Sequence, residues 1–237
     1  VTALSSEGHG QWKLRAQADH HFAMETNAVL LTAVEFSLAA CEYPIVFIQS
    51  KDSVVPVAVL GLKTGQNLFI TDDGKWDAKY IPAYVRRYPF ILSGEPAGNK
   101  DDSTQYTVCI DEDYAGFNQE TGEALFTGSG GHSKYLEGVI AFLKDFQSQG
   151  LATERFCKNI KKLDILEPMQ AKFTLPKQED VTMAGFMVIS AEKLKAKKPL
   201  ELAELVKSDE MALIYHHLSS MRNFASLTAK FTAKSAE

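Results

Sequence analysis

Short apolar runs, separated by polar or glycine residues, follow one another through the first half of the chain. Tyr43–Ile48 and Val54–Leu62 are rich in Val, Ile and Phe and have the length of strands. The polar residues 49–53 between them suit a hairpin connection. Residues 72–74 (Asp-Asp-Gly) are the clearest tight-turn signal, because an Asp-Gly pair tolerates the positive φ angles of hairpin turns. The pattern therefore predicts an antiparallel, meandering sheet.

The rest of this half adds one helix, one loop and one more strand. A short helix is predicted at Tyr80–Arg87, because Pro82 suits a first helical turn and Pro89 ends the helix. Ser93–Ser103 has the glycine, proline and charged residues of an exposed loop. Tyr106–Ile110 then returns to strand character.

The second half changes to helical periodicity. Within His132–Gln149 apolar residues recur every three or four positions, which indicates a helix with one buried face, and Gly150 suits its C-terminal cap. A second helix is predicted to start after Thr153. The further predicted elements are strands at Ala171–Leu175 and Gly185–Ile189 and a long C-terminal helix from Met211 to Ala225.

The strand-like runs of the first half and the helical spacing of the second half together predict an α+β fold. We expect a single domain over residues 1–237, in which a mainly antiparallel sheet from the first half packs against helices mainly from the second half. Residues 1–20 and 229–237, at the two ends, are expected to be poorly ordered. A chain of 237 residues is long enough to bury a substantial core.

Composition narrows the class of protein. Hydrophobic residues make up 45% of the chain and charged residues 23%, which is typical of a soluble globular protein. The formal net charge of −5 argues against a nucleic-acid partner. No apolar run approaches the ~20 residues of a membrane-spanning helix, so membrane insertion is not expected. The opening residues also lack the pattern of a signal peptide.

The three cysteines, Cys41, Cys109 and Cys157, lie far apart in the sequence. None belongs to a Cys-x-x-Cys pair, so the sequence predicts neither a metal site nor a disulfide, and it points to no cofactor. Reduced thiols favour a cytoplasmic location, while an association with the cell envelope stays open.

Several segments form a distinctive series along the chain: EYPIVF at Glu42–Phe47, VAVLGL at Val57–Leu62, DDGKWDAKYIPAYVRRYPF at Asp72–Phe90 and IYHHLSSMRN at Ile214–Asn223. These segments resemble the SapC family, named after a protein encoded with a bacterial surface-layer system. The resemblance extends over nearly the whole chain. It implies an association with surface layers and no established reaction. The glycine-rich residues 127–132 depart from the family pattern.

Three polar clusters suit an ordinary structural role better than a functional one. Residues 128–131 (Gly-Ser-Gly-Gly) precede a predicted helix, where N–H groups can hold an anion, but they lack the lysine of a phosphate loop and suit a flexible turn. The acidic residues 72–73 and 111–113 lack the spacing of a calcium loop and suit solvated turns. His216 and His217 diverge by about 100° on a helix and cannot chelate one metal in the usual way.

A polar triplet lies on one face of the predicted C-terminal helix. His217, Ser220 and Asn223 recur there at intervals of three residues. The triplet could present hydrogen-bonding groups to a ligand pocket, and we include it among the candidate ligand-binding residues. In the alternative, which we favour, it bonds the helix to the sheet, because buried polar groups normally find partners.

Aromatic and arginine residues gather between residues 76 and 90. Together such groups suit recognition of a carboxylate, a peptide or a partner surface. In the alternative, one arginine pairs with an internal carboxylate such as Glu35 or Glu42 and locks helix to sheet. The candidate ligand-binding residues of this block are Trp76, Tyr80, Tyr84, Arg86 and Arg87.

The sequence contains no recognisable catalytic set, since neither a Gly-x-Ser-x-Gly turn nor a metal-ligand motif is present. We therefore expect a non-catalytic accessory protein that binds a peptide or protein partner, linked to surface-layer or envelope processes as the resemblance implies. The alternative is an enzyme acting on peptides or small molecules through a site assembled only in the fold. A deep pocket with perturbed histidines or carboxylates would favour that alternative.

Overall fold

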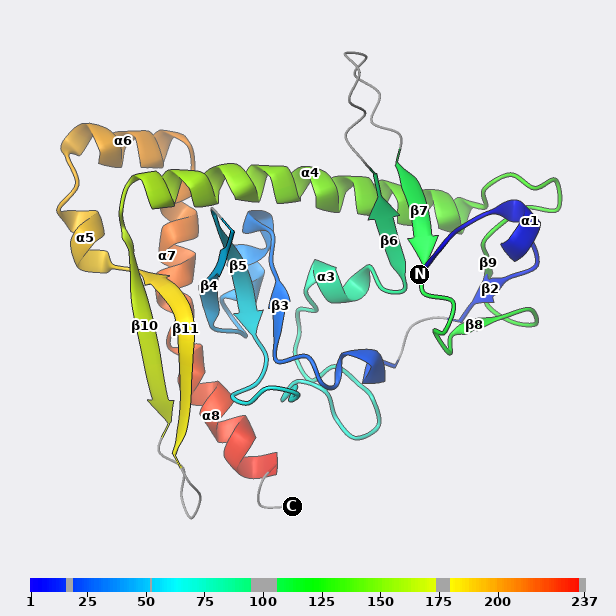
Figure 1. Cartoon of the computed structure of the whole chain (residues 1–237), viewed down its shortest axis with the longest axis horizontal. Helices are drawn as coiled ribbons and strands as arrows, with labels where there is room; N and C mark the ends of the chain where they lie inside the picture. The colour runs from blue at the N-terminus through cyan, green and yellow to red at the C-terminus, as the bar shows by residue number, and fades with distance from the viewer. Residues whose placement is uncertain (16–18, 52, 95–105, 174–179, 235–237) are drawn as a thin grey trace. The chain divides into compact units, whose positions relative to one another are not determined.

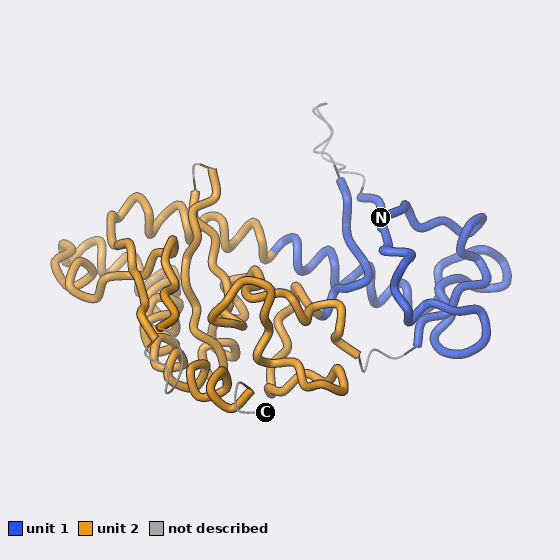
Figure 2. Tube along the Cα trace, turned by 60° about the horizontal axis from the view of Figure 1, so that its bottom comes forward, with its two compact units in different colours: residues 1–18, 86–148 blue, residues 19–85, 149–237 orange. Residues whose placement is uncertain are grey.

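The computed structural model describes residues 1–15, 19–51, 53–94, 106–173 and 180–234. The chain divides into two compact units, shown in different colours in Figure 2. Unit 1 comprises residues 1–18 and 86–148, and unit 2 comprises residues 19–85 and 149–237. The single domain expected from the sequence stays a prediction.

A five-stranded antiparallel sheet forms the centre of unit 2 (Figure 1). Its strand order is β10-β11-β4-β5-β3. The two apolar runs of the first half pair as β4 and β5, with Ile45 opposite Ala58 and Ser50 opposite Ser53. The strands are β3 Ala28–Leu30, β4 Ile45–Ser50, β5 Ser53–Val59, β10 Leu166–Phe173 and β11 Val181–Ile189. The predicted α+β class with antiparallel pairing is confirmed.

Unit 2 also contains several short helices, of which α7 contacts both β4 and β11. The helices are the 3₁₀ turns His21–Ala23 and Ala33–Glu35, α2 Phe36–Ala39, α5 Ala191–Lys195, α6 Pro199–Lys207, α7 Glu210–Ser220 and α8 Asn223–Lys234. The C-terminal helix predicted as one element is therefore two helices, with the break at residues 221–222. This break places Asn223 at the start of α8.

The longest helix is α4, Lys134–Lys162, whose first half belongs to unit 1 and whose second half belongs to unit 2. The sequence predicted two helices here, with Gly150 as a cap between them. The helix continues because its apolar stripe continues: Phe156 and Ile160 are buried in the core of unit 2. Thr153 fits within the helix by donating its hydroxyl to the Gln149 carbonyl (2.7 Å).

Unit 1 contains two small antiparallel sheets, with strand orders β1-β7-β6 and β8-β2-β9. Leu136 and Leu143 of α4 are buried in its apolar core with Phe90 and Ile110. The elements are β1 Thr2–Ala3, α1 Ser6–His9, β2 Lys13–Leu14, β6 Phe90–Ser93, β7 Thr107–Ile110, β8 Phe117–Asn118 and β9 Glu123–Ala124. Regular elements thus occur within residues 1–20, where poor order was expected.

The turn at residues 72–74 is present as predicted. Gly74 has a φ of +75°, and a bridge between Ile70 and Trp76 closes the turn. A Cβ atom on Gly74 would lie 2.5 Å from His21 Nδ1, so glycine is also required by the close approach. Helix α3, Ala83–Arg86, is shorter than the predicted Tyr80–Arg87. Most of the predicted loop at 93–103 lies outside the described residues.

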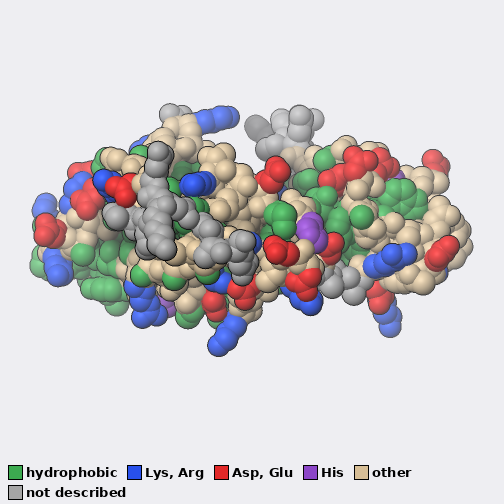
Figure 3. All heavy atoms as spheres, turned by 90° about the horizontal axis from the view of Figure 1, so that it is seen from below, with side chains coloured by type: hydrophobic (Ala, Val, Ile, Leu, Met, Phe, Trp, Pro, Cys, Tyr) green, Lys and Arg blue, Asp and Glu red, His purple; other side chains and the backbone are tan. Residues whose placement is uncertain are grey.

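The surface carries both signs of charge. On the face shown in Figure 3, acidic and basic side chains are interspersed among apolar ones. Within the described ranges, no helix has the length and apolar character needed to cross a lipid bilayer. The three cysteines are free thiols, and burial raises the pKa of the Cys157 thiol to about 12.

Candidate functional site

Trp76 and Tyr80, two of the predicted ligand-binding residues, belong to a hydrogen-bonded chain within unit 2. The indole N–H of Trp76 donates to the Tyr43 hydroxyl at 2.8 Å, and that hydroxyl donates to the Tyr80 carbonyl. Tyr43 is fully buried, and this burial raises the pKa of its hydroxyl above the usual value. Tyr84, the third aromatic residue, packs half-buried against the core of unit 2.

Glu35 is the buried carboxylate that connects this region, and only 4% of it is exposed. One oxygen accepts hydrogen bonds from the Tyr80 hydroxyl (2.8 Å) and the Ala83 N–H (2.7 Å). The other oxygen accepts from the N–H and hydroxyl of Thr32, at 2.7 and 2.9 Å. From the sequence, Glu35 was a possible partner of an arginine, and its bonds to Thr32 were not predicted. The spacing Thr-x-x-Glu, which is that of a capping box, could have indicated them.

Arg86 and Arg87 both stack on aromatic rings of α4 within unit 1. The guanidinium of Arg86 lies 5.2 Å from the ring centroid of Phe142, and that of Arg87 lies 5.6 Å from that of Phe146. Phe142 and Phe146 are four residues apart, so they occupy one face of the helix. This spacing was visible in the sequence, but nothing there indicated which cations would meet the rings. Arg86 is exposed, whereas Arg87 is half-buried.

His217 and Ser220 bond helix α7 to a single residue of β4. The His217 Nδ1–H donates to the Ile45 carbonyl at 2.8 Å, and the Ser220 hydroxyl accepts the Ile45 N–H at 2.9 Å. His217 Nε2 accepts the Ile189 N–H at 3.0 Å. Because a backbone N–H can only donate, Nε2 carries no proton and the imidazole is neutral.

Burial reinforces that neutral state. His217 and Ser220 are completely inaccessible to solvent, and desolvation lowers the pKa of His217 to about 4. Asn223 completes the set by donating its side-chain amide to the carbonyls of Ala40 (2.8 Å) and Tyr43 (3.0 Å). The structure thus brings the three residues of the triplet together and directs their side chains at backbone groups.

The acidic residues 111–113 also make specific contacts in unit 1. Asp111 accepts the Tyr88 hydroxyl at 2.8 Å. Glu112 pairs with His9, whose Nε2 lies 2.9 Å from its carboxylate, and also accepts the Thr2 hydroxyl at 2.7 Å. The hydrogen bond with His9 lowers the pKa of Glu112 most, and the hydrogen bond from Thr2 lowers it further. His9 was not singled out from the sequence, because its partner lies about a hundred residues away.

The glycine-rich segment forms a closed turn. The Thr127 N–H donates to the Gly131 carbonyl (2.8 Å), and the Gly130 N–H donates to the Thr127 carbonyl (2.9 Å). The Thr127 hydroxyl accepts the Gly131 N–H as well (3.1 Å). The N–H groups of Thr127, Gly130 and Gly131 are therefore already used within the turn and are not directed at an anion.

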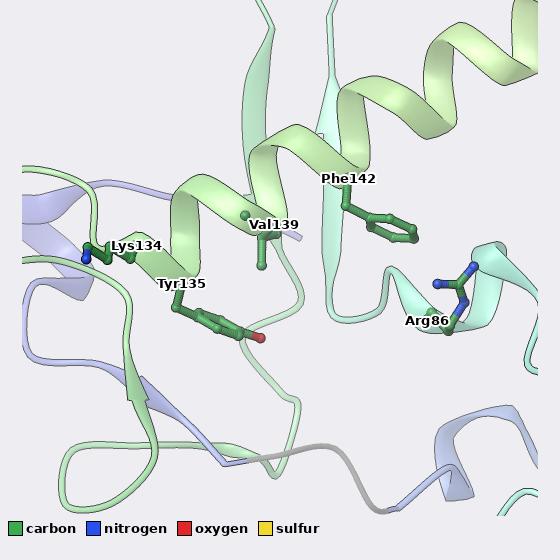
Figure 4. Close-up of a pocket in the computed structure, with 6 residues that line it drawn as sticks. Arg86, Lys134, Tyr135, Val139 and Phe142 are labelled. Atoms are coloured by element: carbon green, nitrogen blue, oxygen red, sulfur yellow. The ribbon is translucent and has the colours of Figure 1, made fainter.

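A groove of about 460 Å³ lies along the first turns of α4 in unit 1. Tyr135, Val139 and Phe142 project from one side of the helix, and Arg86 reaches toward the Phe142 ring (Figure 4). The full lining is Arg86, Lys134, Tyr135, Gly138, Val139 and Phe142. This lining combines two cations with aromatic and aliphatic surface and contains neither histidine nor carboxylate.

Tyr135 anchors the groove to the core beneath it. Its half-buried ring packs against Phe90, with centroids 6.5 Å apart. Burial raises the pKa of Tyr135, and the nearby Glu123 carboxylate adds to that shift. The hydroxyl therefore stays protonated and available as a hydrogen-bond donor at neutral pH. Of the residues predicted from the sequence, only Arg86 lines this groove.

The SapC family model matches residues 4–227 of the chain. This confirms the resemblance seen in the sequence segments. No curated protein and no solved structure matches the chain.

Proposed function

The chain belongs to the SapC family, and we propose that it is a non-catalytic accessory protein that binds a peptide or protein partner in surface-layer or cell-envelope processes. The groove on α4 carries this proposal. Aromatic residues and arginine are enriched where proteins bind one another, and an open groove suits a polypeptide segment. The link to surface layers rests on the family name alone.

The contacts of two buried titratable groups, His217 and Glu35, support binding over catalysis. His217 and Glu35 are each bonded to backbone groups, with the ring of His217 held neutral. A general acid or base must instead reach a bound substrate. The groove, which is open to solvent, is lined by two cations, a tyrosine and apolar side chains, with no histidine or carboxylate among the lining residues.

A peptide library displayed on phage tests the binding function without assuming a ligand. Peptides are selected on the wild-type protein and then measured against Phe142→Ala and Arg86→Glu. We expect each groove variant to weaken the selected peptides at least tenfold, about 1.4 kcal/mol. Thermal unfolding of both variants is the control that checks whether they remain folded.

Two matched variants control for the substitutions themselves. Arg155→Glu makes the same charge change on an exposed residue of α4 in unit 2, and Tyr215→Ala removes an exposed aromatic ring from α7. Both should bind the selected peptides like the wild type. Equal loss in the groove and control variants, or no selected peptide at all, would contradict the proposal. Cleavage of a selected peptide, seen by mass spectrometry, would favour the enzyme instead.

Co-sedimentation with isolated envelope fragments tests the proposed location of the partner. The wild-type protein should sediment with the fragments, whereas Arg86→Glu should stay in the supernatant. Sedimentation that is unaffected by this variant would separate envelope binding from the groove. The link to envelope processes through this site would then be wrong.

A further inference from the structure

We propose that unit 1 contains a second binding site, a cavity that takes an uncharged saccharide. The cavity measures about 270 Å³ and is lined by residues of α1, β2, β9 and the glycine-rich turn at residues 127–131 (Figure 1). It shares no lining residue with the groove on α4, so the inference goes beyond the proposed peptide binding. The neutral polar groups, the charge balance and one glycine of the lining carry it.

Three residues of the lining carry neutral hydrogen-bonding side chains: Ser6, Gln11 and Trp12. Their hydroxyl, amide and indole N–H groups bond to no other group in the part of the chain that the structure describes. The indole N–H can only donate, whereas the amide and the hydroxyl can both donate and accept. A sugar hydroxyl also donates and accepts, so it can satisfy each of the three groups.

Trp12 gives the cavity a fixed aromatic wall. Its ring packs edge-on against His9, with centroids 4.8 Å apart, and lies 5.2 Å from the ring of Phe117. His9 is itself held by Glu112, whose carboxylate lies 2.9 Å from its Nε2. The apolar C–H groups of a sugar ring suit an aromatic surface, while its hydroxyls reach the polar groups beside it. A wall held in place also lowers the entropic cost of binding.

The charges at the cavity favour neither sign. Of the lining residues that the structure describes, only Lys13 is charged, and its ammonium donates to the Glu120 carbonyl at 3.0 Å. Glu7 and Glu123 each adjoin a lining residue in the sequence and carry the opposite charge. A ligand of either sign therefore meets a like charge near the cavity, and a neutral ligand avoids the cost of burying a charge there.

Gly128 of the lining has no structural reason to be glycine. A Cβ atom added there would meet nothing within 4 Å, and its φ angle is not in the left-handed region. Its N–H has no backbone acceptor within the described ranges. Glycine is used where a backbone approaches a ligand closely. A sugar that lies against this turn and accepts the N–H gives the glycine a role.

NMR of the indole N–H groups in nitrogen-labelled protein tests the site, because the chain has two tryptophans, Trp12 and Trp76. The Trp12→Phe variant assigns the two resonances. Neutral disaccharides selected on a glycan microarray should shift the Trp12 resonance and leave that of Trp76, which donates to Tyr43 in unit 2, unchanged. A microarray on which no neutral sugar binds, equal shifts of both resonances, or a shift confined to Trp76 would overturn the proposal.

Two pairs of variants test the lining itself. Gln11→Ala removes an amide partner and Gly128→Ala places a methyl group against the ligand, so each should weaken the selected disaccharide at least fivefold. Gln119→Ala, on an exposed residue of unit 1, and Gly150→Ala, where a Cβ atom also has open space, are the matched controls. Both should bind like the wild type. Equal binding by all four variants would show that the cavity is not the site.

Charged analogues test the neutrality of the ligand. The uronic acid and amino-sugar counterparts of the selected disaccharide should both bind at least fivefold more weakly than the neutral sugar. Equal or tighter binding of either analogue would mean that Lys13 or the neighbouring carboxylates set the sign of the ligand, and the inference would be wrong. Arg86→Glu should bind the sugar like the wild type, so a failure here leaves the proposed peptide binding to its own test.

Discussion

Two helix faces of this protein look alike in sequence and differ completely in their surroundings. The α7 face carries His217 and Ser220 in unit 2, and the α4 face carries Tyr135 and Phe142 in unit 1. On α7, both imidazole nitrogens and the serine hydroxyl are bonded to backbone groups. On α4, Tyr135 and Phe142 border a groove that Arg86 of α3 also lines. Mixed polar and aromatic character therefore does not tell whether a helix face is bonded to the backbone or borders a groove.

The difference has a thermodynamic consequence. A buried polar group that loses its partner costs about 1–3 kcal/mol, whereas substitutions on an exposed surface usually change stability by less than ~0.5 kcal/mol. The α7 face should therefore respond to substitution mainly through stability. The α4 face should respond mainly through binding.

The largest effect is expected for His217→Ala. This change leaves the Ile189 N–H and the Ile45 carbonyl without their side-chain partner and opens a cavity in the core. We expect a loss of about 3–5 kcal/mol in the free energy of unfolding, measured by urea titration. His216→Ala, at the neighbouring residue, is the control and should cost far less. A loss below ~1 kcal/mol for His217→Ala would mean that the hydrogen bonds of the α7 face contribute little.

Acidification should destabilise the protein through the same residue. The folded-state pKa of His217 is about 4, below the ordinary histidine value of 6.5, so between these pH values only the unfolded chain binds the proton. Stability should therefore fall as pH drops from 6.5 toward 4, by roughly 3 kcal/mol at about 1.4 kcal/mol per pH unit.

The non-titrating variant His217→Gln isolates this contribution. Its stability should be lower at neutral pH and should fall less steeply than that of the wild type between pH 6.5 and 5, where His20, whose pKa is also lowered by burial, still contributes. Parallel curves for the two proteins would show that another group causes the acid sensitivity. Glu112 and Asp73 contribute at lower pH. Hydrogen bonds lower the pKa values of both carboxylates, so their contribution to stability is lost only when the pH falls below their ordinary pKa values.

Ser220→Ala gives an intermediate effect. The hydroxyl accepts the Ile45 N–H and donates to the His217 carbonyl at 2.6 Å, so its removal leaves one buried donor unpaired. We expect a loss of about 1–2 kcal/mol in denaturant unfolding. Ser219→Ala, on an exposed neighbour, should stay within ~0.5 kcal/mol. Equal effects at both serines would remove the distinction between buried and exposed hydroxyls on this helix.

The smallest stability effect is expected at Arg86 of α3, beside the α4 face. Arg86→Ala removes the stacking on Phe142 and should cost about 0.5–1 kcal/mol, the size of an exposed cation–π contact. A double-mutant cycle with Phe142→Leu measures the coupling between the two residues directly. A coupling energy near zero would show that the ring does not hold the guanidinium in place.

The sequence by itself determined the class of fold. The apolar runs around Tyr43–Ile48 and Val54–Leu62 form paired strands, because β periodicity and turn chemistry are local properties. The Asp-Asp-Gly turn is present for the same reason, with Gly74 at positive φ. Family membership was also readable from the linear segments. In contrast, Gly150 did not end a helix, since burial of the following apolar stripe outweighs the small cost of one glycine.

Only the tertiary structure decided what the polar residues contact. Glu35, considered as an arginine partner, accepts hydrogen bonds from Thr32, Tyr80 and Ala83 instead. Arg86 meets Phe142, more than fifty residues away, and helps to form a groove that no local pattern marks. Hydrogen bonds and ring contacts depend on which distant segments fold together. That information lies in the packing of the whole chain, whereas the paired strands β4 and β5 and the turn at residues 72–74 follow largely from their own few residues.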